Sequence, residues 1–198
     1  MRKKEDKKNY KSTLNKLKRS LLTTKKELYF YKKQNEKLKK ELEELRKVSY
    51  TDSLTKLNNR RCLENIGDYD SLILGDIDHF KKINDTYGHT TGDEVLVQIS
   101  LVLKKYIRET DLVCRWGGEE FLILLKNCND EVAFLKADLL KEKIKELSDS
   151  FGFDITMSFG ISNLSNNTLE DAINKADKAM YKSKIDGRNR VTIYKLTP

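Results

Sequence analysis

Proline occurs once in this sequence of 198 residues, as Pro198, tryptophan occurs once and histidine twice. The three cysteines, Cys62, Cys114 and Cys128, are odd in number and lack C-x-x-C spacing, which argues against a disulfide framework and against a zinc site. No apolar run approaches the ~20 residues that cross a bilayer, and the N-terminus is charged where a signal peptide is apolar. We therefore expect a soluble protein of the reducing cytoplasm, with no membrane segment in this chain.

Acidic residues are scarce in the first 49 positions, which contain 18 Lys and Arg against 7 Asp and Glu, whereas residues 50–198 contain 21 against 24. The net charge of +8 is therefore a property of the N-terminal segment. Lys and Arg gain affinity for nucleic acids by releasing phosphate counterions, but a segregated basic excess is also typical of a solvated helix face. We do not expect nucleic acid to be the main partner. A basic segment that regulates an attached domain by binding nucleic acid or an acidic surface stays open.

Residues 1–49 contain neither glycine nor proline and carry a heptad pattern. The a positions are Leu14, Leu21, Leu28, Asn35 and Leu42, and the d positions are Leu17, Thr24, Tyr31, Leu38 and Leu45. A single Asn at an a position favours a parallel, in-register dimer, because the two amides then bond each other across the seam. The pattern predicts a parallel homodimeric coiled coil over residues 1–49. The alternative is one amphipathic helix folded back on its own domain.

After Tyr50 the pattern changes to a mixed series that predicts an α/β (α+β) domain over residues 50–198. Expected strands cover residues 71–77, 111–115, 121–125, 154–161 and 190–194, and expected helices cover 91–108, 131–147 and 169–185. Residues 116–120, Trp-Gly-Gly-Glu-Glu, separate two of these strands and predict a β-hairpin with a glycine turn.

Two acidic pairs stand at the ends of expected strands: Asp76 with Asp78, and Glu119 with Glu120. Neighbouring carboxylates repel each other, and Mg²⁺ typically binds one or two carboxylates together with substrate phosphates. An acidic turn taken alone is more often a solvated loop.

The residues around these acids favour a phosphoryl-transfer site. Gly117 and Gly118 remove side chains from the turn, so that a bulky ligand can approach the backbone. Residues 79–82, His-Phe-Lys-Lys, follow the first acidic pair, where the free N–H groups of a helix start and lysine ammonium groups can hold phosphate. Carboxylates, a metal ion and phosphate binders together describe nucleotide chemistry.

Four motifs in this order resemble the GGDEF-domain diguanylate cyclases, over essentially all of residues 50–197. They are DSLTKLNNRR at 52–61, where Lys56 replaces the usual glycine; DIDHFKKIND at 76–85 with GH at 88–89 and GD at 92–93; GGEEF at 117–121; and AxxAMYKSK at 176–184 followed by GRN at 187–189. One pentapeptide is a weak signal, but four motifs in register are not expected by coincidence. The resemblance implies a nucleotidyl-cyclase-like palm domain with a central five-stranded sheet.

The resemblance also implies a role for each matching residue. Asp76, the backbone carbonyl of Ile77 and Glu119 are expected to hold Mg²⁺ or Mn²⁺, with Glu119 also a proton acceptor. The substrate-binding set comprises Lys81, Lys184, Arg188 and the backbone near Phe80 for the triphosphate, Asn84 and Asp93 for the guanine edge, His89 beside them, and the turn glycines Gly117 and Gly118. A helix-end or packing role for His89 is equally compatible with its position.

The reaction implied by the resemblance joins two GTP molecules into cyclic di-GMP and releases two pyrophosphates. Each domain binds one GTP, so two copies must face each other, and a dimerising stalk serves that need. Arg108 and Asp111 fit the family's R-x-x-D site for product inhibition, five residues before the GGEEF motif, although a surface salt bridge at a helix end has the same spacing. The alternative in another class is a catalytically silent module that senses GTP or cyclic di-GMP.

Overall fold

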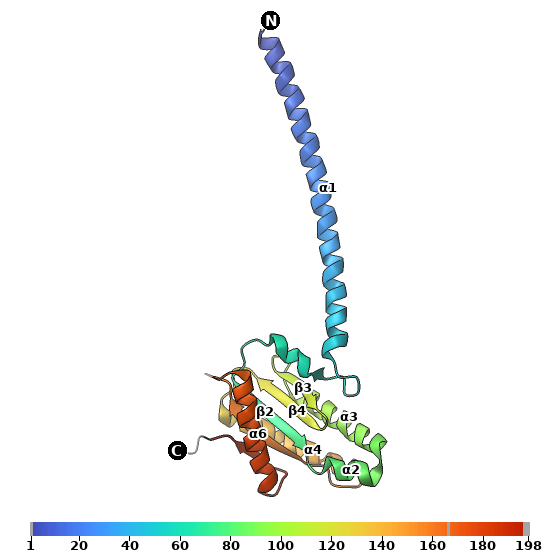
Figure 1. Cartoon of the computed structure of the whole chain (residues 1–198), viewed down its shortest axis with the longest axis vertical. Coiled ribbons are helices and arrows are strands. Elements are labelled where there is room, and N and C mark those ends of the chain that lie inside the picture. The colour runs from blue at the N-terminus through green and yellow to red at the C-terminus, as the bar shows by residue number, and fades with distance from the viewer. Residues whose placement is uncertain (1, 166, 196–198) are drawn as a thin grey trace. The chain divides into compact units, whose positions relative to one another are not determined.

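The computed structural model describes residues 2–165 and 167–195, and the chain divides into two units, residues 1–49 and 50–198 (Figure 1). Each unit is considered by itself. Within the described residues no helix combines the length and the apolar character needed to cross a membrane.

The first unit is the helix α1 (Arg2–Tyr50). Seven side chains of the heptad seam, Leu17, Leu21, Leu28, Tyr31, Leu38, Leu42 and Leu45, are exposed over 50–68% of their surface. Lys37 and Glu41 form an ion pair of 3.5 Å one turn apart on the same helix. The expected helix is confirmed, and its apolar seam lies open to solvent in the single chain. Pairing with a second copy stays a prediction.

The second unit is built on a six-stranded sheet in the order β1-β3-β4-β2-β5-β6. The strands are β1 (Asn58–Asn59), β2 (Ser71–Ile77), β3 (Leu112–Gly117), β4 (Glu120–Leu125), β5 (Met157–Asn163) and β6 (Val191–Ile193). The neighbours β3/β4, β4/β2 and β2/β5 are antiparallel, and the outer pairs β1/β3 and β5/β6 are parallel. The five-stranded sheet implied by the resemblance is therefore present, and the two-residue β1 extends its edge.

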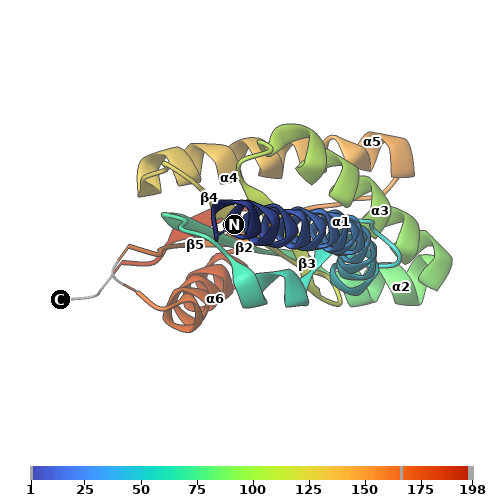
Figure 2. The same cartoon turned by 90° about the horizontal axis from the view of Figure 1, so that it is seen from above.

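Helices cover both faces of this sheet (Figure 2). They are α2 (Phe80–Tyr87), α3 (His89–Tyr106), α4 (Asp130–Lys145), α5 (Leu147–Phe151) and α6 (Leu169–Ile185), and a 3-10 helix η1 spans Arg60–Asn65. In the view from above, α3, α4 and α5 lie on one side of the strands and α6 lies on the other. The unit is a three-layer arrangement with the sheet in the middle.

The alternation of side chains along the fully buried β2 explains why each face has its own core. Ile73 and Ile77 join the apolar cluster that includes α3 and α4. Leu72 and Leu74 join the cluster that includes α6 and η1. The same period of two places Asp76 on the α6 side, at the strand's end. The pattern of β2 therefore sets which helix can reach that carboxylate.

Close packing of α6 on β5 depends on small residues. A Cβ atom at Gly160 would overlap the carbonyl oxygen of Ala176 and the amide of Met180. Two serines bond across the same contact: Ser162 Oγ donates to Ala172 O at 2.7 Å, and Ser183 Oγ donates to Phe159 O at 2.8 Å. Because Ser183 immediately precedes Lys184, this contact fixes the stretch of α6 that presents Lys184 to the sheet.

The expected strand 71–77, the glycine hairpin and the helix 169–185 are confirmed. The strand expected at 154–161 begins later, at Met157, because the amide of Ile155 donates to Ser148 Oγ at 2.9 Å instead of to a neighbouring strand. The helix expected at 131–147 ends at Lys145 and is followed by the separate short helix α5.

Candidate active site

The end of β2 and the turn at residues 117–120, which we call the glycine turn, lie side by side because of strand register. Asp76 of β2 is paired with Glu120 of β4, and the amide of Ile77 donates to the carbonyl of Glu119 at 3.3 Å. The turn is tight, with Gly118 at φ +28° and a register shift between Arg115 and Gly117. These contacts bring Asp76, Ile77 and Glu119, the expected metal ligands, to one edge of the sheet.

Negative charge is concentrated at this edge, and we call Asp76, Glu119 and Glu120 the acidic edge. Asp76 is 6% exposed, and its Oδ1 lies 2.9 Å from Nζ of Lys184 on α6. Burial raises the pKa of Asp76, and Lys184 opposes that rise. Burial and then the charge of Asp76 raise the pKa values of both Glu119 and Glu120. Three carboxylates therefore share the charge of one lysine.

The donor set of the acidic edge fits a hard divalent cation. Among the described residues, no group of three His, Cys, Asp or Glu side chains is arranged as a complete metal cage. Mg²⁺ does not need such a cage, since it is usually bound by one or two carboxylates, waters and substrate phosphates. The carboxylates of Asp76 and Glu119 and the backbone carbonyl of Ile77 match that requirement. Burial, followed by neighbouring carboxylates, raises the pKa values of Asp76 and Glu119.

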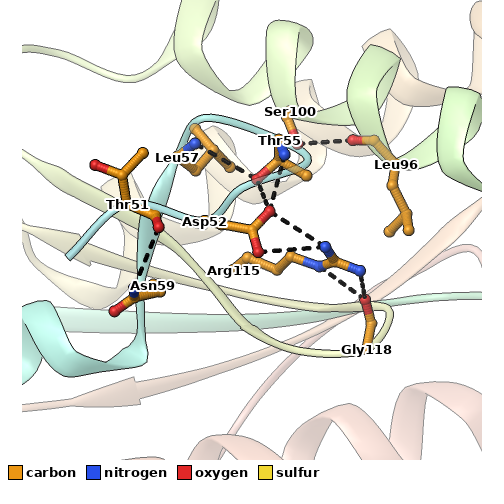
Figure 3. Close-up of polar contacts among 9 residues, drawn as sticks. All are labelled: Thr51, Asp52, Thr55, Leu57, Asn59, Leu96, Ser100, Arg115 and Gly118. Carbon is orange, nitrogen blue, oxygen red and sulfur yellow. Dashed lines mark hydrogen bonds and ion pairs between the residues drawn. The ribbon is translucent and has the colours of Figure 1, made fainter. Parts of the chain in front are cut away.

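Arg115 on β3 holds the glycine turn to the start of the domain (Figure 3). Its Nε and Nη2 donate to the carbonyl of Gly118 at 3.0 and 2.8 Å, and its Nη1 donates to Asp52 Oδ1 at 3.2 Å. Asp52 Oδ1 also accepts from the amide and the hydroxyl of Thr55, at 2.8 and 2.7 Å. We call this network the Asp52 anchor. It ties the segment after residue 50 to the backbone of the glycine turn.

The loop of the Asp52 anchor contains the residue that departs from the family pattern. Lys56 has φ +57°, a left-handed conformation that glycine adopts without strain. Its amide donates to the carbonyl of Asp52 at 3.0 Å, so the loop's own hydrogen bonds hold the lysine there. The observed backbone explains why glycine is the usual residue in this motif.

Two expected guanine-binding residues lie on neighbouring helices. Asn84 is half-buried on α2, and Asp93 is exposed near the start of α3. A Cβ atom at Gly92 would overlap Asn84 Oδ1, so the glycine makes room for that amide directly beside Asp93. His89 is exposed at the first position of α3, after Gly88 at φ +87°. The helix pair α2/α3 therefore carries the residues expected to contact the base.

The expected phosphate-binding residues lie on α2, on α6 and on the loop that follows α6. Lys81 is exposed in the first turn of α2, and Phe80 begins that helix. The N-cap residue His79 makes no side-chain capping bond, which leaves amides of the first turn free for an anion. Lys184 comes from α6, and Arg188 is exposed on the loop that follows it. Arg188 also lines a cavity of about 530 Å³ between that loop, α2 and residues 153–156.

Asp78 does not behave like the acidic edge, although the sequence pairs it with Asp76. It is 4% exposed, and both of its oxygens accept hydrogen bonds: Oδ1 from Ser158 Oγ at 2.7 Å, and Oδ2 from Thr156 Oγ1 at 2.7 Å and from the amide of Asn189 at 3.0 Å. The expected metal ligands do not include Asp78, and donors of the protein already satisfy its carboxylate. We call this network the Asp78 anchor.

Comparison with known proteins identifies the domain. The sequence model of the family described as "Diguanylate cyclase, GGDEF domain" matches residues 49–190. The chain belongs to the GGDEF family. Diguanylate cyclase A of Treponema denticola is 42% identical over 131 residues, which make up 63% of this chain and 35% of that relative. The chain therefore spans about a third of that protein's length.

Solved structures of GGDEF proteins share this architecture. The coiled coil and GGDEF domain of DgcB from Caulobacter crescentus, solved in complex with c-di-GMP, is 29% identical with a TM-score of 0.72, covering 84% of this chain and 96% of that one. The active GGEEF domain of a diguanylate cyclase from Vibrio cholerae is 35% identical with a TM-score of 0.62, covering 69% of this chain and 88% of that one.

The expected inhibitory pair lies at the opposite end of β3 from the glycine turn of this GGDEF domain, roughly 20 Å away along six residues. Arg108 is exposed, and Asp111 is half-buried with its Oδ1 accepting from the amide of Lys126 at 3.1 Å. The amide of Asp111 donates to the carbonyl of Arg108 at 3.1 Å, which forms a turn. The structure thus keeps this pair apart from the residues of the acidic edge.

Sequence reasoning missed two residues near the GGDEF site. Arg115 lies two positions before the turn, but nothing local shows that its partners are Asp52 and Gly118. Asp177 raises the pKa values of Asp76 and Glu120 from α6. Asp177 lies seven residues before Lys184, two turns earlier on the same helix face, and this spacing could have identified it from the sequence.

Proposed function

We propose that this GGDEF domain condenses two GTP molecules into cyclic di-GMP and releases two pyrophosphates. The observation that carries the proposal is the acidic edge, where Asp76 and Glu119 meet beside Lys184 at the end of β2. Family membership and the neighbouring α2/α3 pair support a nucleotide as the ligand.

Asp76, the carbonyl of Ile77 and Glu119 would hold Mg²⁺ or Mn²⁺. When bound, the cation supplies charge neutralisation at the phosphates and lowers the pKa of a ribose 3′-hydroxyl. Asn84 and Asp93 would accept and donate hydrogen bonds at the guanine edge, and His89 lies beside them. The amides near Phe80 together with Lys81, Lys184 and Arg188 would hold the triphosphate, while Gly117 and Gly118 leave room for it.

In each half-reaction, the 3′-oxygen of one GTP forms a bond to the α-phosphorus of the other. The bond between the α-phosphorus and the bridging oxygen breaks, and pyrophosphate leaves. Glu119 would accept the hydroxyl proton. Because one domain supplies one nucleotide site, two domains must face each other for both phosphodiester bonds to form.

The direct test incubates the full chain with GTP and Mg²⁺ and measures pyrophosphate and cyclic di-GMP. We expect both products, in a ratio of two to one, with EDTA and ATP substitution as controls that give neither. Binding of GTP without pyrophosphate release would contradict the proposal and identify the domain as a nucleotide-binding module instead.

We propose that α1 pairs in parallel with α1 of a second copy. The exposed leucine seam and Asn35 at an a position support this arrangement. Deletion of residues 1–45 should lower specific activity at low protein concentration and allow partial recovery at high concentration. Insertion of four residues should preserve the dimer but change activity, because a stutter rotates the attached domain. A monomeric full chain with concentration-independent activity would overturn this pairing.

We also propose that Arg108 and Asp111 bind cyclic di-GMP as a feedback inhibitor. Arg108 is exposed, and its guanidinium can bond a guanine edge or a phosphate in a bidentate manner. Arg108→Ala should abolish inhibition by added cyclic di-GMP while the initial rate stays within twofold. Unchanged inhibition in the variant would show that the match to R-x-x-D is accidental.

A further inference from the structure

The Asp78 anchor joins three segments that are distant in the sequence: the end of β2, the start of β5 and the loop after α6. Its acceptors are both carboxylate oxygens, and its donors are Ser158, Thr156 and the amide of Asn189. The amide of Asp78 itself donates to the carbonyl of Thr156 at 2.9 Å. Asp78 is therefore fixed to β5 through its side chain and its backbone, and it holds the amide of Asn189 from that fixed position.

The loop that receives this contact has a strained backbone. Gly187, Arg188 and Asn189 have φ values of +117°, +63° and +47°, and only the first is a glycine. Left-handed conformations of other residues persist where the surroundings hold them in place. Three hydrogen bonds hold this loop. The amide of Arg188 donates to the carbonyl of Ser183 at 3.0 Å, the amide of Asn189 donates to Asp78 Oδ2 at 3.0 Å, and Nε of Arg190 donates to the carbonyl of Arg188 at 3.1 Å.

Arg188 depends on this backbone for its direction. Its side chain is exposed, and among the described residues it has no ion pair that would orient the guanidinium. The anchoring carboxylate lies two residues after Asp76 in the same segment. The segment 76–78 thus connects the acidic edge at one end to the Arg188 loop at the other.

From these contacts we infer that Asp78 is a positioning residue, which sets Arg188 against the nucleotide phosphates by holding the strained loop. This inference rests on the proposed role of Arg188 in binding GTP. Asp78 itself binds neither substrate nor metal, because its oxygens are occupied by Ser158, Thr156 and Asn189.

The test measures KM and kcat for GTP, and the equilibrium binding of 3′-deoxy-GTP, which lacks the attacking hydroxyl and so binds without turnover. Asp78→Ala should raise KM and the dissociation constant about tenfold or more, with kcat changed less than threefold. Asp78→Asn, which keeps an acceptor for the amide of Asn189, should recover most of this affinity. Ser158→Ala removes one donor that fixes Asp78 but leaves the Asn189 contact, so its KM should rise less than that of Asp78→Ala. Ser71→Ala is the matched control, because it removes another buried serine hydroxyl that bonds Cys128 O, and its KM should stay within twofold.

A double-mutant cycle with Arg188→Ala distinguishes positioning from general disruption. If Asp78 acts through Arg188, Asp78→Ala should change the affinity less than twofold in the Arg188→Ala background. Effects that multiply in the double variant, or a loss of kcat at unchanged KM, would overturn the inference. If Asp78→Ala fails to fold by circular dichroism, the cycle is run with Asp78→Asn, for which a two- to fivefold effect that disappears in the Arg188→Ala background is expected.

The same measurements separate this inference from the proposed function. A wild-type chain that binds no 3′-deoxy-GTP and releases no pyrophosphate contradicts the proposed function. A wild-type chain that binds the nucleotide, is weakened by Arg188→Ala and is unaffected by Asp78→Ala contradicts the positioning role alone.

Discussion

At the acidic edge three carboxylates share one lysine, whereas at each of the two anchors a single carboxylate receives three donor groups. Burial is the first cause that raises the pKa values of Asp76, Glu119 and Glu120. Neighbouring carboxylates add to it: Asp78 and Asp177 for Asp76, and Asp76 for both glutamates. Asp52 has a lowered pKa: burial acts to raise it, but hydrogen bonds from Thr55 and the guanidinium of Arg115 outweigh that effect. These four carboxylates and Asp78 belong to one domain. Those of the acidic edge face other carboxylates, whereas those of the two anchors face hydrogen-bond donors.

The difference separates two uses of negative charge. A carboxylate whose hydrogen bonds are satisfied stabilises the fold and holds a loop in place, as the Asp52 anchor holds Gly118 through Arg115. Carboxylates that repel one another destabilise the cation-free protein and bind a cation in compensation. We therefore expect substitutions at the acidic edge to affect activity and substitutions at the anchors to affect stability as well.

The largest effect is expected for Glu119→Gln, which removes charge from the acidic edge without changing side-chain volume. Activity should fall by about 100-fold or more, which corresponds to about 3 kcal/mol of transition-state stabilisation. The free energy of unfolding, measured by urea denaturation without metal, should stay equal or increase, because the variant relieves repulsion. Glu64→Gln, an exposed position in η1, is the charge-matched control. Turnover within tenfold of wild type would contradict the metal-ligand role.

Asp52→Asn should lower the free energy of unfolding and should reduce activity less than Glu119→Gln does. The variant loses the ionic contact with Arg115, whose side chain is 17% exposed, and the free energy of unfolding should decrease by about 1.5–3 kcal/mol. Activity should fall about tenfold, because Arg115 then holds Gly118 less firmly. Urea denaturation and initial rates measure the two effects, with Asp68→Asn as an exposed control. A variant as stable as wild type would show that the Asp52 anchor does not stabilise the fold.

The pH dependence of stability sharpens the same contrast. Because the pKa of Asp52 is lowered in the folded protein, its stabilisation is present above the unfolded pKa, near pH 4, and is lost as pH falls through the folded value. The difference in unfolding free energy between wild type and Asp52→Asn should therefore be constant from pH 7 to 5 and shrink below about pH 4. A difference that grows on acidification would show that Asp52 does not stabilise the fold through its charge.

The smallest effect is expected for Lys56→Gly in the loop of the Asp52 anchor. Glycine removes a left-handed strain of about 1–2 kcal/mol but adds about 0.5–1 kcal/mol of chain entropy to the unfolded state. The net gain in unfolding free energy should be about 0.5–1 kcal/mol, with activity unchanged. Lys56→Ala keeps the Cβ atom and should give no gain, so equal stability of the two variants would contradict the strain argument.

The sequence predicted much of the fold because local patterns sufficed. The apolar run 71–77 has the length of a buried strand, the glycine turn separates two such strands, and the helical period of 169–185 appears without reference to other segments. The later start of β5 was not predictable, because a serine 7 residues away takes the amide of Ile155. The anchoring role of Asp78 was not predictable for the same reason, since Ser158 and Asn189 are 80 and 111 residues away.

The sequence by itself determined the order of five strands and of the helices α3, α4 and α6, the heptad pattern of residues 1–49 and the motifs that assign the domain to the GGDEF family. Only the tertiary structure decided which acids repel and which anchor, because Asp76 and Asp78 are identical side chains two residues apart. Strand register set Asp76 opposite Glu120 and within reach of Lys184, while Asp78 met hydroxyls and an amide from β5 and the Arg188 loop. The energy of a buried carboxylate depends on the donors around it, and those donors come from segments that only folding brings together.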